Sequence, residues 1–125
     1  MNVRGYHWNV SGSDFFTLHV KFEELYTALQ LQIDELAERI LTLRGTPLHA
    51  YSDFARISAI KEDKNVSEGR ACVQGVLTGL NMLIAKQREV IATAEQADDQ
   101  ATADILTGYV KEQEKLVWMY NAYLG

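Results

Sequence analysis

The chain has 125 residues, 47% of them apolar and 23% charged, with 12 basic and 17 acidic side chains and a net charge of -5. We expect residues 1–125 to form a single domain around one core, which excludes a multidomain enzyme, a disordered chain and a membrane-spanning one. The acidic balance disfavours nucleic acid as a partner of the bare surface and favours cations. One cysteine and no visible secretory leader predict a soluble protein of the reducing cytoplasm.

The spacing of apolar residues predicts helices throughout. Met1 to Val10 is expected to be only the end of a first helix, so that this helix is truncated, and a loop from Asn9 to Asp14 follows, with Ser13 as a candidate N-cap. A long helix is expected from Phe15 to Arg44, with one continuous apolar stripe. The stripe consists of Phe15, Leu18, Phe22, Leu25, Leu29, Ile33, Leu36, Ile40 and Leu43.

The end of this helix and the connection after it also have local signals. Arg44 places a cation near the helix C-terminus, Gly45 can take a positive φ, and Pro47 prevents continuation. The connection from Leu48 to Asn65 contains a short helix, because Tyr51, Phe54 and Ile57 have helical spacing.

Two more long helices are predicted, from about Val66 to Gln96 and from Ala101 to Tyr123, with an acidic turn at Ala97 to Gln100. Cys72 is expected to be a small buried residue, and His49 a surface residue. The predicted fold is all-α, a four-helix bundle with a short helix in the long connection and part of the first helix missing.

A second, polar stripe runs along the helix that begins at Phe15. With His19 at zero, Glu23, Asp34 and Glu38 fall at about 40°, 60° and 100° around the axis, so all four face one way. Each pair has i, i+4 spacing, which lets two side chains on adjacent turns reach one ion. Imidazole and carboxylate donors suit iron(II), manganese or zinc.

The two pairs are too far apart to share one ion within a chain. His19 and Asp34 lie fifteen residues apart, which corresponds to about 22 Å along a helix. If two copies of this helix pack antiparallel about an axis near Ala28 and Leu29, each pair meets the other pair of its mate. Two equivalent intersubunit sites result, and His7 is a candidate for a second imidazole beside His19.

The motifs resemble the Dps family, the miniferritins named as DNA-binding proteins from starved cells. The resemblance is most specific in Arg4-Gly5-Tyr6-His7-Trp8-Asn9-Val10, Phe15-Phe16-Thr17-Leu18-His19 and Ile33-Asp34-Glu35-Leu36-Ala37-Glu38, and it extends over nearly the whole chain. It implies a ferritin-like four-helix subunit. It also implies a homododecamer that oxidises Fe(II), preferentially with hydrogen peroxide, and stores the ferric mineral inside.

By position, the resemblance assigns His7, His19 and Glu23 as iron ligands from one subunit and Asp34 and Glu38 as ligands from its two-fold mate. The family usually has aspartate where Glu23 stands. Trp8 matches a tryptophan near the ferroxidase centre, where it takes up an oxidising equivalent or simply packs at the dimer contact.

Three further acids, Asp98, Asp99 and Asp104, are candidates for a pore that admits the cation or, alternatively, for helix N-terminal acids. Direct DNA binding is disfavoured because no basic arm is present. Two other functions remain open. One is a DNA-compacting particle, and the other is a non-catalytic helical protein that uses the long helix only to dimerise.

Overall fold

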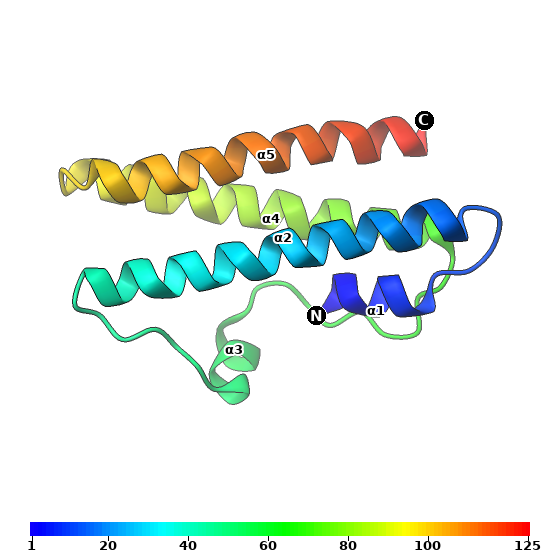
Figure 1. Ribbon diagram of the computed structural model, residues 1–125, viewed down its shortest axis with the longest axis horizontal. Coiled ribbons are helices and arrows are strands. Elements are labelled where there is room, and N and C mark those ends of the chain that lie inside the picture. The colour runs from blue at the N-terminus through cyan, green and yellow to red at the C-terminus, as the bar shows by residue number, and fades with distance from the viewer. The chain divides into compact units, whose positions relative to one another are not determined.

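Five helices and no strand make up the computed structural model, which describes residues 1–125 (Figure 1). In chain order they are α1 (Asn2–Asn9), α2 (Phe15–Thr42), α3 (Tyr51–Ile57), α4 (Gly69–Gln96) and α5 (Gln100–Leu124). The all-α class is confirmed, and none of these helices is long and apolar enough to cross a membrane. The chain divides into two compact units, Met1–Val66 and Ser67–Gly125. The expectation that residues 1–125 form a single domain therefore stays a prediction.

In the first unit, α1 lies against the N-terminal part of α2 (Figure 1). Gly12, at φ +100°, allows the intervening loop to turn back, a conformation that favours glycine. The ring of Tyr6 packs at 55° to that of Phe22, with centroids 6.0 Å apart. Leu18, Phe22 and Leu25 are buried, whereas Ile33 is 60% exposed and Leu43 is 54% exposed. Only the first half of the predicted stripe is therefore in the core of this chain.

Both ends of α2 differ in detail from the sequence prediction. Asp14, not Ser13, occupies the N-cap position. At the other end the left-handed residue is Arg44, at φ +64°, and not Gly45. Gly45 N–H donates to the carbonyl of Ile40 at 2.9 Å, and Arg44 N–H donates to that of Leu41 at 2.9 Å. This pair of bonds is a Schellman motif, which satisfies the last helical carbonyls and places the residue after the C-cap, here Arg44, in the left-handed conformation.

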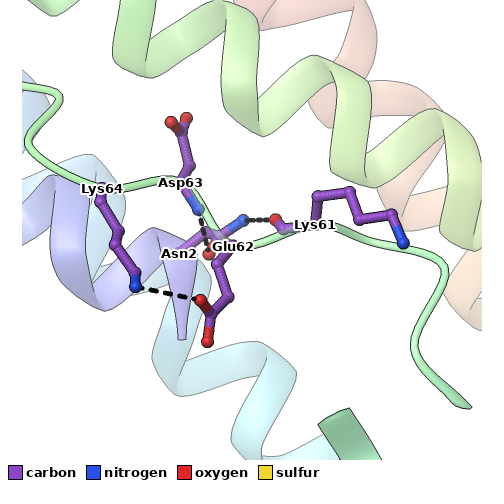
Figure 2. A network of polar contacts seen from close by, with 5 residues as sticks. All are labelled: Asn2, Lys61, Glu62, Asp63 and Lys64. Carbon is purple, nitrogen blue, oxygen red and sulfur yellow. Dashed lines mark hydrogen bonds and ion pairs between the residues drawn. The ribbon is translucent and has the colours of Figure 1, made fainter. Parts of the chain in front are cut away.

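The connection after α2 contains the predicted short helix, observed as α3, and then returns to α1. Asn2 Nδ2 donates to the carbonyl of Lys61 at 2.8 Å, and the backbone N–H of Asp63 donates to Asn2 Oδ1 at 3.3 Å (Figure 2). Tyr6 Oη adds a bond to Asp63 Oδ2. These bonds hold the end of the connection on the short helix that carries His7.

In the second unit, α4 and α5 form an antiparallel hairpin (Figure 1). Its buried apolar residues include Cys72, Val73, Val76, Leu77, Leu80, Ala103, Leu106 and Val110, so the burial predicted for Cys72 is confirmed. α4 begins three residues after the predicted Val66, because Glu68 caps it by accepting from Arg70 N–H at 3.0 Å and Ala71 N–H at 2.7 Å. An ion pair between Arg88 and Glu114 joins the two helices.

Candidate metal centre

Two histidines from different helices lie face to face in the first unit. His7, on α1, and His19, on α2, stack with ring centroids 3.8 Å apart and planes 19° apart. His7 Nδ1 lies 2.7 Å from the backbone carbonyl oxygen of His19, and His19 Nδ1 lies 2.8 Å from that of His7. His7 is buried and His19 half-buried. The predicted second imidazole beside His19 is therefore observed.

The two hydrogen bonds between each Nδ1 and the backbone carbonyl of the other histidine select the tautomer of both rings. A carbonyl oxygen can only accept, so each Nδ1 must donate and carry the proton. The lone pair of each neutral ring is then on Nε2, the atom left for a metal ion. A metal-binding histidine commonly uses its other N–H in this way, bonded to a carbonyl or carboxylate that fixes the ring. The pair is thus chemically suited to bind a transition metal through both Nε2 atoms.

Aromatic residues enclose the imidazole pair. Phe15 stacks on His19 with centroids 5.0 Å apart and planes 27° apart. Tyr26 lies edge-on to His7 at 5.3 Å and 81°. The guanidinium carbon of Arg4 lies 4.2 Å from the centre of the Tyr26 ring. The sequence predicted only a core position for Phe15 and did not single out Tyr26. The contact of Phe15 with His19 could have been predicted from the sequence, because residues four apart on one helix are neighbours on its surface.

The carboxylates lie along the exposed side of the same helix. Glu23, Asp34 and Glu38 are all exposed. Since α2 is continuous over 28 residues, the fifteen residues from His19 to Asp34 correspond to about 22 Å. The structure therefore brings His7 to His19 but leaves Asp34 and Glu38 at the far part of α2. Within one chain no group of three or more His, Cys, Asp or Glu side chains is placed to hold a metal ion.

The carboxylates share their face with exposed apolar side chains. Phe16 is 82% exposed and Leu31 is 68% exposed, and Val20 and Leu41 are exposed as well. With His19 at zero, these four residues fall between about 40° and 120°, the same sector as the three acids. Trp8, which follows His7, is 63% exposed. A mixed apolar and acidic helix face of this kind is typical of a surface that another molecule covers.

The acids near the α4–α5 turn have local structural roles. Asp99 is the N-cap of α5 and accepts from Thr102 N–H at 3.1 Å. Asp104 accepts from Gln100 Nε2 at 2.8 Å. Asp98 takes the left-handed conformation, at φ +57°, that ends α4. A pore lined by these residues stays a prediction. His49 is exposed and its Nδ1 contacts the carbonyl oxygen of Pro47 at 3.1 Å.

Comparison with known proteins shows the family. A model of the ferritin-like domain matches residues 1–125. The DNA protection during starvation protein of Porphyromonas gingivalis is 39% identical over 122 residues, covering 98% of this chain and 77% of that protein. The chain belongs to the Dps family. The Dps protein from Vibrio cholerae O1 is 50% identical with a TM-score of 0.98, covering 100% of this chain and 79% of that one. That of Bacillus brevis is 39% identical with a TM-score of 0.96, covering 99% and 83%.

These Dps relatives confirm the ferritin-like fold expected for the chain. The Vibrio protein is described as a member of a broad superfamily of ferritin-like diiron-carboxylate proteins. Membership of the Dps family supports a role in iron storage and iron oxidation in general. The chain spans about three quarters of the length of the Porphyromonas and Vibrio relatives.

Proposed function

We propose that the protein is a ferroxidase that oxidises Fe(II) at sites between two-fold related subunits and stores the ferric product. The ligands are His7, His19 and Glu23 from one copy and Asp34 and Glu38 from its mate. The observation that supports this most strongly is the stacked imidazole pair, because both Nε2 atoms are left free for a metal while both Nδ1 atoms are bonded to carbonyls.

Antiparallel pairing of α2 about the point between Ala28 and Leu29 completes the donor set. In that register His19 lies opposite Glu38 of the mate, and Glu23 lies opposite its Asp34. The same register sets the exposed Phe16 opposite Leu41 of the mate. One arrangement therefore covers the exposed apolar side chains and brings carboxylates to the imidazoles. Burial of the apolar side chains favours association, and the acids contribute the negative charge that a cation needs.

The proposed reaction balances with hydrogen peroxide as the oxidant. Two Fe(II) ions each give up one electron, the O–O bond breaks, and two protons from solvent complete two molecules of water. Paired one-electron donors avoid release of a hydroxyl radical, because both electrons reach the peroxide at one site. The chain's contribution is to hold two ions close together and to stabilise Fe(III) over Fe(II) with anionic oxygen ligands. Dioxygen is the alternative oxidant.

Trp8, which is not a ligand, and Glu23, which is one, have further proposed roles. Trp8 is exposed next to His7, where it packs against the mate or takes up an oxidising equivalent. Glu23 stands where the family usually has aspartate, and its longer side chain shifts the position or occupancy of the second iron.

The complete assembly in this proposal is a hollow homododecamer of the cytoplasm. It stores the ferric mineral inside and thereby limits oxidative damage.

Anaerobic Fe(II) loading followed by one addition of hydrogen peroxide tests this function. Ferric absorbance is expected to rise rapidly, at about two Fe(II) per peroxide, in the wild type. A His19→Ala, Asp34→Ala double variant is expected to lose the rapid phase. A Glu24→Ala, Glu35→Ala variant of the same helix removes two exposed acids from outside the proposed site and serves as the matched control. Equally slow oxidation in all three proteins would leave only a helical dimerisation protein.

DNA compaction is the second candidate function, favoured by the description of the Porphyromonas relative as a DNA protection protein. The net charge of -5 disfavours it for this chain. Gel retardation of duplex DNA measured at rising salt distinguishes the two functions. Absence of retardation at low salt is expected, whereas retardation that weakens steeply with salt would support DNA binding.

A further inference from the structure

The imidazole pair is part of a longer column of groups in contact, which is stacked from Phe15 to His7 and edge-on between His7 and Tyr26. The order of groups along the column is Phe15, His19, His7, Tyr26 and Arg4, with neighbouring contacts at 5.0, 3.8, 5.3 and 4.2 Å. Phe15, His19 and Tyr26 come from α2, and His7 and Arg4 come from α1. Each imidazole therefore contacts the other imidazole and one aromatic side chain, with Phe15 nearly parallel to His19 and Tyr26 nearly perpendicular to His7.

The hydrogen bonds alone leave each imidazole one rotational degree of freedom. The bond from Nδ1 fixes which edge of the ring faces the carbonyl, but the ring plane can still tilt about that bond. An aromatic side chain in contact with the ring restricts this tilt, since tilting would press the imidazole against it, whether the contact is stacked, as with Phe15, or edge-on, as with Tyr26. The direction of each Nε2 lone pair, and the angle between the two, then depends on the enclosing rings.

The geometry points to Phe15 and Tyr26 as positioning residues that set the planes of His19 and His7 for metal binding. This inference rests on the proposed function, because it concerns how the same site holds its metal. Arg4 supports Tyr26 through a cation–π contact over its ring. Phe15 has no metal-donor atom, and Tyr26 contacts His7 through its ring, so both act through the histidines and not as ligands.

Co(II) titration of the whole chain under anaerobic conditions tests the inference without iron oxidation. Phe15→Leu and Tyr26→Leu remove the ring, and Phe15→Tyr and Tyr26→Phe keep it as matched controls. Partners that orient metal ligands change affinity by about 10- to 100-fold when they are lost. We expect the Leu variants to weaken Co(II) binding by about tenfold or more and to change its visible absorption bands. The aromatic controls should retain the wild-type affinity and spectrum.

The outcomes separate the inference from the proposed function. Wild-type affinity and bands in both Leu variants would overturn the positioning role and leave the metal site intact. A wild-type protein that takes up no Co(II) would overturn the site and the positioning role together. Circular dichroism and size-exclusion chromatography check the fold of each variant. Where a Leu variant does not fold, Phe15→Met or Tyr26→Met repeats the test, because methionine fills the volume flexibly without a flat ring.

Discussion

The hydroxyl of Tyr6 donates a 2.6 Å hydrogen bond to Oδ2 of Asp63, a residue 57 positions further along the chain. Tyr6 precedes His7 on α1, and its ring is buried against Phe22. Together with the bonds of Asn2 to Lys61 and Asp63 that Figure 2 shows, this contact ties α1 to the connection that follows α3. A helix of 8 residues is unstable alone, so such contacts determine whether His7 is held in place.

Removal of the Tyr6 hydroxyl should loosen α1. Tyr6→Phe keeps the buried ring but loses the bond to a carboxylate, which costs about 1 to 2 kcal/mol because Asp63 is exposed to water. Amide hydrogen exchange of α1 is expected to accelerate by about 5- to 30-fold at that cost. Asp63→Asn, which retains an acceptor oxygen, should have the smaller effect. Unchanged exchange in Tyr6→Phe would show that the ring alone holds the helix.

The Schellman motif at the end of α2 predicts opposite effects for two neighbouring substitutions. Arg44→Gly should stabilise the protein by about 1 kcal/mol, since glycine takes φ +64° without the steric cost borne by arginine. Gly45→Ala should destabilise it, because the new Cβ would lie 2.9 Å from Ile40 Cγ2 and 3.3 Å from its carbonyl oxygen. Thermal unfolding of the two variants at one protein concentration measures both changes. Stabilisation by Gly45→Ala would contradict this account.

The intersubunit site predicts complementation between two inactive chains. Co-refolded His19→Ala and Asp34→Ala chains form mixed pairs in which one site has both defects and the other has none. Random mixing should therefore restore about a quarter of the wild-type rapid oxidation. A His19→Ala and Glu23→Ala mixture is the control, since every site of each mixed pair then has one defect. Equal activity in the two mixtures would exclude ligands shared between subunits.

The charge of Glu23 should matter most for the second iron. Glu23→Gln removes an anionic ligand and is expected to lower the amount of metal bound from about two ions per site towards one. Glu23→Asp keeps the charge and should retain both ions. Calorimetric titration with Zn(II), which is not oxidised, gives the stoichiometry. Two tightly bound ions in Glu23→Gln would show that Glu23 is not a ligand.

The sequence determined the helices and the position of the acids along them. Apolar residues at steps of three and four predicted α2 to begin at Phe15, as observed, and placed α3 within the connection. The same arithmetic set His19 about 22 Å from Asp34, because the rise of a helix is fixed for any sequence. These features depend on local geometry alone.

Only the tertiary structure decided how α1 meets α2. The stacking of His7 on His19, and its enclosure by Phe15 and Tyr26, depend on the path of the loop between the helices, which the periodicity of neither helix encodes. The position of the left-handed turn, on Arg44 instead of Gly45, is a local detail that the residue types did not predict, because the bonds to Ile40 and Leu41 end the helix one residue earlier. Ile33 and Leu43 are exposed in the single chain because a helical period shows which residues share a face, whereas tertiary packing decides which part of that face is covered.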